Sequence, residues 1–269
     1  MQNKVSFLGP NGTFTHEAAS SISENLISYC SIQSVMESVV NGECDKGVVP
    51  IENSIEGSVT LTLDLLVHKF NLMIENEIII PINHNLLVNP GTQIEDISDV
   101  YSHSQALAQC QPFLEKLNVK KHFTLSTAAA AKKVEGHKNY AAIGTLTSGK
   151  LYNLKPLVSN VQDNDTNQTR FIILSKKDHI PTGHDKTSIV FSLYDDASSG
   201  ALYKVLKIFS NKNINLSKIE SRPSKEGLGS YIFFIDLEGH RKDKNIFDIL
   251  NEVKEKTSFF KILGSYPIY

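Results

Sequence analysis

Short apolar runs alternate with amphipathic stretches along residues 1–175 of the chain. Apolar residues recur at helical spacing in 58–70, in 105–117 and in the alanine-rich stretch 128–134, whereas other runs have the length of buried strands. Such alternation is typical of an α/β layer fold. The predicted strands are 5–8, 47–51, 73–81, 86–88, 100–101, 121–125, 140–143 and 170–174.

The run 76–88 is long for one strand and is interrupted by Pro81. Proline in a strand belongs at an edge or a bend, so this run predicts a crossing of the chain from one lobe to another. The polar stretch 156–170 predicts the return crossing. Two lobes joined by two crossings leave a cleft between them, which is the usual place for a small-molecule site.

A polar segment at 178–186, with Pro181 and Gly183, predicts a linker. Beyond it the order strand, helix, strand, strand, helix, strand fits inside about 80 residues and is ferredoxin-like. Two helices on one side of that sheet would leave its other face or its edge available for pairing. We therefore expect two domains, 1–178 and 186–269. The C-terminal elements are expected at 187–194, 200–209, 216–221, 230–237, 245–256 and 259–264.

Composition limits the classes of partner. The chain is 41% hydrophobic and 21% charged, which suits a compact globular fold. A net charge of -2 without a lysine or arginine run argues against a nucleic-acid partner. The chain also lacks a secretory signal and a long apolar span, so we expect a cytoplasmic protein without a membrane partner. Cys30, Cys44 and Cys110 have no CxxC spacing, so they are expected to be buried thiols and not metal ligands.

Polar side chains gather where predicted strands end, which is where α/β folds place ligands. Each group has an alternative role as a helix cap, for example at Ser58 or Ser104. A helix start near Thr13 offers backbone N–H groups to an anion. The candidates in these loops are Thr13, Asn53, Ser54, Ser102, Gln105, Ser126 and Thr127.

The stretch 160–174 packs polar residues in front of an apolar run. A calcium loop is excluded because Gln168 stands where glycine is required and Leu174 where glutamate is required. The stretch also contains two glycosylation patterns, which begin at Asn164 and Asn167, but a chain without a secretory signal does not meet the glycosylation machinery. Arg170 at the start of an apolar strand needs an anionic partner, and a substrate carboxylate would serve.

Several segments, in order along nearly the whole chain, resemble the prephenate dehydratase family. They are GPNGTFTHEAA, GVVPIENSIEGSV, SHSQALAQC, STAAAA and NQTRF, followed by GALYKVL, NLSKIESRP, YIFFIDLEGH and LGSYP. The resemblance implies a two-lobed, periplasmic-binding-protein-like catalytic domain and a C-terminal ACT regulatory domain. It also implies a carbon–oxygen lyase that converts prephenate to phenylpyruvate, carbon dioxide and water in phenylalanine biosynthesis, with no cofactor and no metal. Because the first matching segment begins at Val5, a monofunctional enzyme is expected.

The family's TRF motif assigns Thr169 as the group that is hydrogen-bonded to the leaving hydroxyl. Arg170 is then the candidate carboxylate anchor and Phe171 a wall for the ring, with Asn53 and Gln105 as further candidates for the catalytic set. The other loop residues named above are candidate substrate contacts. Ser104 stands where the family has proline in SHPQ, a change that the loop should tolerate.

In the regulatory domain the resemblance implies phenylalanine as effector and a homo-oligomer, either a dimer or a tetramer. The candidate effector residues are Gly200, Ala201, Leu202, Glu220, Ser221, Arg222 and Pro223. Tyr203 departs from the GALV motif, a change that concerns effector affinity. The alternatives are an arogenate dehydratase, a non-catalytic two-lobed amino-acid sensor, or a C-terminal domain that only dimerises.

Overall fold

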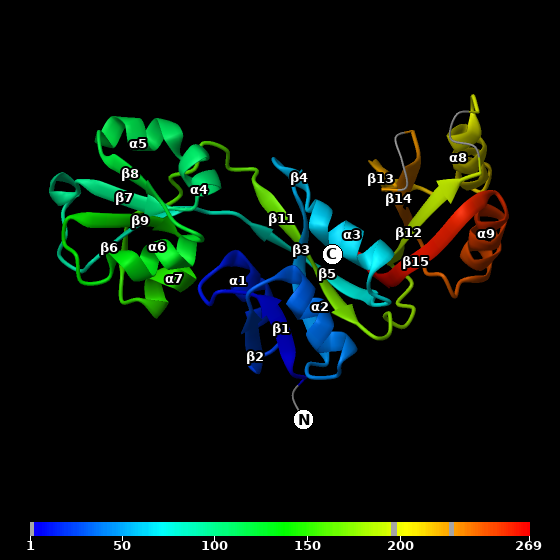
Figure 1. The fold of residues 1–269 in the computed structure, drawn as a ribbon, viewed down its shortest axis with the longest axis horizontal. Coiled ribbons are helices and arrows are strands. Elements are labelled where there is room, and N and C mark those ends of the chain that lie inside the picture. The colour runs from blue at the N-terminus through cyan, green and yellow to red at the C-terminus, as the bar shows by residue number, and fades with distance from the viewer. Residues whose placement is uncertain (1–2, 195–197, 226–228) are drawn as a thin grey trace. The chain divides into compact units, whose positions relative to one another are not determined.

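The computed structural model describes residues 3–194, 198–225 and 229–269 (Figure 1). The chain divides into two compact units. The first unit consists of Met1–Thr62 and Ile79–Phe171, and the second of Leu63–Ile78 and Ile172–Tyr269. The chain therefore leaves the first unit and returns to it before it enters the second unit for good.

The N-terminal sheet has the strand order β2-β1-β3-β11-β5, and β4 pairs with β3. Its strands are β1 (Val5–Leu8), β2 (Leu26–Tyr29), β3 (Lys46–Asn53), β4 (Gly57–Ser58), β5 (Met73–Pro81) and β11 (Gln168–Ser175). The helices along this part of the chain are α1 (Phe14–Ser20), α2 (Ile32–Val40) and α3 (Thr60–His68), and most of α3 belongs to the second unit. β1 pairs in parallel with both β2 and β3, so the carboxyl ends of these strands meet at one edge of the sheet.

A second sheet in the first unit has the order β10-β6-β9-β7-β8. Its elements are β6 (Asn85–Val88), the 3-10 helix η1 (Ile94–Asp96), β7 (Asp99–Ser102), α4 (Ser104–Ala108), α5 (Gln111–Leu117), β8 (Lys120–Phe123), α6 (Thr127–Val134), β9 (Tyr140–Gly144), α7 (Leu146–Leu151) and β10 (Lys155–Val158). Successive strand residues face opposite sides. Leu86 and Val88 therefore pack in one cluster with α4 and α5, while Leu87 packs with α6 on the other side.

Two crossings join these sheets and lie side by side. The chain leaves β5 at Pro81 and enters β6 at Asn85, and it returns between β10 and β11. The amide of Ile82 donates to the carbonyl of Asn167 at 2.8 Å, and the amide of Val161 donates to the carbonyl of His84 at 2.9 Å. Because each crossing satisfies backbone groups of the other, residues of both are held at fixed positions between the two sheets.

The C-terminal sheet has the order β13-β14-β12-β15. It is built from β12 (Asp185–Leu193), α8 (Ala201–Asn211), β13 (Leu216–Pro223), β14 (Tyr231–Glu238), α9 (Lys244–Glu255) and β15 (Thr257–Pro267). Ile189, Phe191 and Ile235 form a core with the apolar faces of α8 and α9. The predicted strand–helix–strand–strand–helix–strand order is present.

Part of the other face of this sheet is covered within the second unit, so of the two expected alternatives, a free face or a free edge, the first is corrected and the second stays a prediction. The alternate residues Val190 and Phe234 are buried too. Lys261 on β15 donates to the carbonyls of Leu66 and Phe70, at 2.6 and 2.9 Å, just where α3 ends. Lys186 pairs with the buried Glu77 at 2.7 Å.

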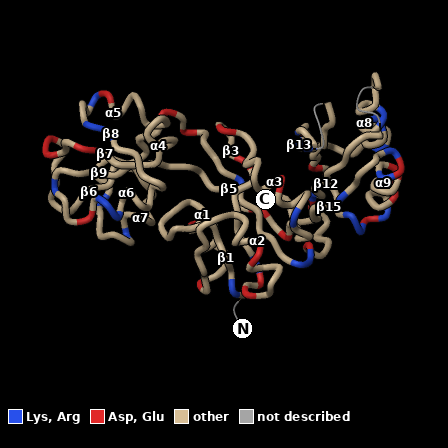
Figure 2. The backbone as a smooth tube through the Cα atoms, in the orientation of Figure 1, with Lys and Arg blue, Asp and Glu red and all other residues tan. Residues whose placement is uncertain are grey.

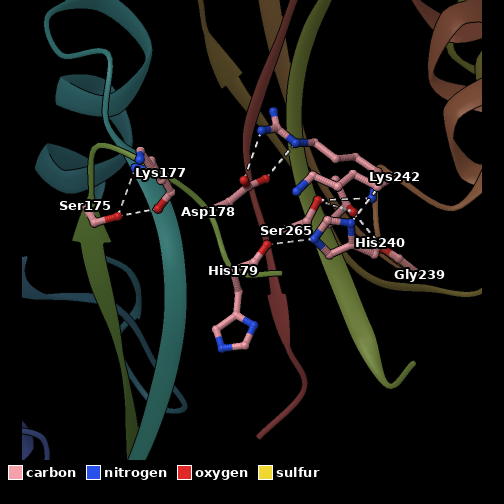
Figure 3. Close-up of polar contacts among 10 residues, drawn as sticks. Ser175, Lys177, Asp178, His179, Gly239, His240, Lys242 and Ser265 are labelled. Carbon is pink, nitrogen blue, oxygen red and sulfur yellow. Dashed lines mark hydrogen bonds and ion pairs between the residues drawn. The ribbon is translucent and has the colours of Figure 1, made fainter. Parts of the chain in front are cut away.

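The segment between β11 and β12 is held against the C-terminal sheet (Figure 3). Asp178 forms an ion pair with Arg241 at 2.6 Å, and the buried ring of His240 donates to the carbonyl of His179 at 3.0 Å. The first residues of the predicted linker, Asp178 and His179, are therefore held against the C-terminal sheet by these contacts.

Some local predictions need correction. The predicted helix 105–117 is two helices, α4 and α5, because Pro112 lies at the start of α5 and proline cannot continue a helix from the preceding turn. Ser58 does not cap α3, since it lies in β4, and the N-cap of α4 is His103, not Ser104. Cys30 is exposed, whereas the other two cysteines are buried as expected. The sequence also did not predict β2, β10, α2 and α7.

None of the helices in the described ranges is both long and apolar enough to span a membrane.

Candidate active site

A cavity of about 330 Å³ lies between the two sheets of the first unit. Both lobes line it. The predicted residues that reach it are Thr13, Asn53, Gln105, Ser126, Thr127 and Thr169. Six of the loop and strand-end predictions thus meet in one place, although they are far apart in the sequence.

Helices begin at this cavity. Thr13 caps α1 by accepting from the amide of His16 at 3.3 Å, and Ser126 caps α6 by accepting from the amide of Ala129 at 3.0 Å. The cap role and the site role therefore coexist in the same residues. The first backbone N–H groups of a helix and the positive end of its dipole favour an anion.

Asn53 determines the direction of the hydrogen bond to Thr169. The Oδ1 atom of Asn53 accepts from the amides of Ile55 and Glu56, both at 3.0 Å. Its Nδ2 atom must therefore donate, and it lies 2.9 Å from Oγ1 of Thr169 and 2.8 Å from Oδ1 of Asn167. Because Oγ1 of Thr169 accepts from Asn53, its own hydroxyl proton is left to donate elsewhere.

Further hydrogen bonds lead from Asn53 through Asn167 to Gln109, whose Oε1 atom is an acceptor. The Nδ2 atom of Asn167 donates to Oε1 of Gln109 at 3.1 Å. The Nε2 atom of His84 lies 3.0 Å from that same oxygen and must therefore donate to it. We call this set of five side chains (His84, Gln109, Asn167, Asn53 and Thr169) the amide relay; all five line the cavity.

The cavity is poor in charge. Among its described lining residues there is no lysine or arginine, and His84 and His103 are the titratable side chains. Figure 2 shows basic and acidic positions interspersed along the chain. Burial lowers the pKa of His84, and its hydrogen bond with Gln109 opposes that shift. An anion in this cavity would therefore meet hydrogen-bond donors and not a fixed cation.

Four predicted site residues do not line this cavity. Arg170 lies 3.2 Å from Glu52, which supplies the anionic partner that the sequence argument required. Ser102 is fully buried and donates to the carbonyl of Ile143 at 2.7 Å. Ser54 accepts from the amide of Gln168 at 2.9 Å. Successive side chains of a strand point to opposite faces, so Thr169 and Arg170 cannot both reach the cavity.

Phe171, the fourth, is 2% exposed and lines a neighbouring cavity of about 450 Å³. That cavity also contacts Asn53, Gln105 and Thr169. Phe171 thus lies two positions beyond Thr169 on the same side of β11, as strand geometry requires.

Three relay members escaped the sequence analysis, namely His84, Gln109 and Asn167. Each lies in a stretch that was recognised for another reason. His84 is the middle one of three polar residues, 83–85, between Ile82 and Leu86, so the apolar pattern did not mark it as buried. In the fold it is 3% exposed, and a buried polar side chain must find partners that the sequence does not name.

In the second unit, the candidate effector residues lie at two element ends. Gly200 is the N-cap of α8 with φ of 78°, a left-handed conformation that favours glycine. Arg222, near the end of β13, lies 3.1 Å from Asp64 of α3. Glu220 lies 3.2 Å from Lys218.

Comparisons with known proteins identify the family of the chain. The family model described as prephenate dehydratase matches residues 5–179, and the model described as ACT domain matches residues 187–255. The chain belongs to the prephenate dehydratase family. The predicted family and fold class are confirmed, and so is the activity: the chain is a hydro-lyase that dehydrates prephenate in phenylalanine biosynthesis.

Relatives of this family match over nearly the whole chain. The prephenate dehydratase of Bacillus subtilis is 40% identical over 99% of this chain and 99% of its own. The bifunctional chorismate mutase/prephenate dehydratase of Aquifex aeolicus is 44% identical over 98% of this chain and 73% of its own. A crystal structure of the prephenate dehydratase of Arthrobacter aurescens in complex with L-Phe has a TM-score of 0.89 and 36% identity, and the match covers 98% of this chain and 90% of that one.

Proposed function

We propose that Thr169 assists the departure of the ring hydroxyl of prephenate, and that the amide relay holds Thr169 in the donating orientation. The observation that carries this proposal is the hydrogen bond from Asn53 to Oγ1 of Thr169. Without that bond the hydroxyl of Thr169 could equally accept. With it, the hydroxyl presents a proton to a ligand in the cavity.

The reaction needs little from the protein beyond this. The bond between the ring and its carboxylate breaks, carbon dioxide leaves, and the electron pair moves into the ring. The carbon–oxygen bond then breaks at the opposite ring position, and the hydroxyl leaves as water once it has gained a proton. A hydrogen bond from Thr169 to that oxygen stabilises the negative charge that develops there. The amide of Asn53 stabilises charge on Oγ1 in turn.

The ring carboxylate of prephenate, which leaves as carbon dioxide, would be held by neutral donors. The N-terminal turn of α6, with Ser126 and Thr127, supplies backbone and side-chain donors at one side of the cavity. Thr13 and Gln105 line it as well. Neutral donors suit a reaction that releases one carboxylate as an uncharged gas, because a tightly bound cation would stabilise the substrate more than the transition state.

Arg170 has a supporting part in this proposal. Its ion pair with Glu52 joins β3 to β11 next to Asn53 and Thr169. A lysine at this position can keep the charge but not the planar guanidinium. We therefore expect Arg170→Lys to lower kcat through the spacing of Asn53 and Thr169. Direct anchoring of a substrate carboxylate by Arg170 is the alternative, and it would raise KM instead.

We also propose that the second unit binds phenylalanine as a feedback inhibitor. The match to the ACT domain and the relative with bound L-Phe support this. Gly200, Ala201 and Leu202 would face the effector's carboxylate at the start of α8. Glu220, Ser221 and Pro223 lie near the end of β13, where its ammonium group would be met. A homo-oligomer and a cytoplasmic location belong to the same proposal.

The activity and its regulation can be tested in one assay series on the full chain. Prephenate and arogenate are offered separately, and phenylpyruvate or phenylalanine is measured as product. Turnover of prephenate with inhibition by phenylalanine is expected. Preference for arogenate would make the protein an arogenate dehydratase, and absence of both turnovers would favour a sensor. Turnover that phenylalanine does not inhibit would leave the second unit only a role in dimerisation. Sedimentation measures the oligomeric state, and cell fractionation tests the cytoplasmic location.

A further inference from the structure

His84 occupies a special place in the first unit. It lies on the outgoing crossing, and its backbone amide donates to Oε1 of Gln162 on the return crossing at 2.9 Å. Its ring meets the ring of Phe14 edge-on, with centroids 5.7 Å apart. The residue is 3% exposed and still lines the cavity. It is therefore a buried titratable group within reach of a bound ligand.

The relay settles which ring nitrogen carries the proton. Since Oε1 of Gln109 is an acceptor, Nε2 of His84 is the donor. The other nitrogen, Nδ1, is buried and has no hydrogen-bond partner in the part of the chain that the structure describes. A buried polar atom without a partner is unfavourable, so Nδ1 is an atom that a ligand could satisfy.

The charge of the ligand decides which protonation state of Nδ1 can bind it. Prephenate brings two carboxylates into a cavity whose described lining has no lysine or arginine. The lone pair of a neutral Nδ1 would repel a carboxylate, whereas a protonated Nδ1 would donate to it. Protonation of Nδ1 leaves the bond from Nε2 to Gln109 intact, so no rearrangement of the relay is needed.

We propose that His84 takes up one proton from solvent when prephenate binds, and that Nδ1–H then donates to a substrate carboxylate. No covalent bond forms or breaks in this step. The inference rests on the proposed function of the cavity. It makes His84 the group that balances part of the substrate's charge, a role separate from that of Thr169.

Other titratable groups lie on the elements around His84. Asp163 and Asp165 lie on the return crossing, where the amide of Asp163 donates to the carbonyl of Gln109 and Asp165 accepts from Gln162 at 3.4 Å. On α1, Nδ1 of His16 accepts from the amide of Gly12 at 3.1 Å, so it already has a partner. His103 lies at the cavity too. A test must therefore separate His84 from these groups.

The pH dependence of catalysis is the first test. Burial lowers the pKa of His84 in the free protein, so near neutral pH the binding of each substrate molecule must be accompanied by the uptake of a proton from solvent. We expect kcat/KM to fall by up to about tenfold per pH unit above that pKa. The value of kcat should stay level over the same range, since the bound carboxylate keeps His84 protonated.

A matched pair of variants separates charge from position. In His84→Gln the side-chain amide can still donate to Gln109 but cannot titrate, so the slope of kcat/KM should vanish and KM should rise about tenfold at the acid end. In His84→Asn the shorter side chain cannot reach Gln109, so kcat should fall as well. His103→Gln is the control and should keep the slope of the wild type.

Proton uptake can also be measured directly. Prephenate is titrated calorimetrically into Thr169→Ala protein in buffers of different ionisation enthalpy. About one proton per bound prephenate is expected near neutral pH, and none in the double variant with His84→Gln.

A wild-type kcat/KM that does not change with pH would overturn the inference, as would proton uptake that persists without His84. The first result does not depend on whether a variant folds, because the wild-type profile alone can contradict the proposal. Failure of the proposed function would look different, since Thr169→Ala would then turn over prephenate at the wild-type rate, whatever the pH profile of the wild type.

Discussion

The cavity of the first unit and the interior of the second unit use buried polar groups differently. In the cavity the buried polar groups are amides, a hydroxyl and an imidazole, joined by hydrogen bonds between neutral groups. The second unit has neutral hydrogen bonds too, such as that between Thr187 and Ser265, but it adds ion pairs, with Lys186 against Glu77 at 2.7 Å and Arg222 against Asp64 at 3.1 Å.

The difference separates two tasks. An ion pair holds two segments together. Replacing one of its two charged residues leaves the other charge buried without a partner. A chain of neutral hydrogen bonds is weaker, but every donor has a set direction, and the atoms at its ends remain for a ligand. The ion pairs of the second unit thus serve attachment, and the hydrogen bonds of the cavity serve orientation.

The largest effect is expected from breaking a buried ion pair. Lys186→Met should lower the free energy of unfolding by about 3–5 kcal/mol, because the Glu77 carboxylate stays buried without its lysine. Urea unfolding measures this. Lys204→Met, at an exposed helix position, is the control and should change stability by less than about 0.5 kcal/mol. Equal stability of the two variants would contradict the attachment role.

Loss of the hydroxyl at the end of the relay should affect turnover and not stability. Thr169→Ala is expected to lower kcat by a factor of roughly 10² with KM little changed, since a transition-state hydrogen bond is lost. Thr169→Ser should retain most of the activity. Thr166→Ala removes a hydroxyl that bonds Asn164 in the same loop and serves as the control. Turnover of Thr169→Ala at the wild-type rate would exclude Thr169 from the chemistry.

The ion pair between α3 and β13 should matter for regulation. Asp64→Asn removes the anion opposite Arg222, and we expect inhibition by phenylalanine to weaken by about fivefold, a typical coupling between sites. The value of kcat without effector should stay the same. Lys225→Ala removes the more exposed partner of Asp64 and should have a smaller effect. Unaltered inhibition of Asp64→Asn would show that this pair only attaches β13 to α3.

The smallest expected effect is the loss of stability in acid. It should set in at a higher pH for His84 in the first unit than for Asp185 in the second unit. The pKa of His84 lies below its usual 6.5 because of burial, so the unfolded chain binds more protons and stability falls as the pH drops through that range. Burial raises the pKa of Asp185, but hydrogen bonds from Thr182 and Gly183 outweigh it and hold that pKa below the usual 3.8. Its contribution is therefore lost at more acid pH.

Thermal unfolding of the wild type and of His84→Gln across this pH range measures the difference. A shallower loss of Tm in His84→Gln near pH 6 is expected. Identical curves would mean that His84 does not titrate in the free protein.

Most of the architecture was accessible from the sequence because it rests on local signals. Apolar periodicity located β1, β5, β9 and β11, and it gave the C-terminal strand and helix order. Pro81 indicated the first crossing. Pro112 carried the signal for the break between α4 and α5, but the apolar pattern on both sides hid it. β2 is partly exposed along its length, so it had no clear apolar run to reveal it.

The site depended more on tertiary structure. By itself the sequence determined that a threonine and an arginine lie at the start of a buried strand, behind polar loops at other strand ends. Only the fold decided that Thr169 faces the cavity while Arg170 faces Glu52, since successive side chains of a strand point to opposite faces. The relay joins positions up to 116 residues apart, and its donor directions follow from contacts that no local pattern contains. Local periodicity encodes which residues are buried, whereas hydrogen-bond direction exists only once distant segments have met.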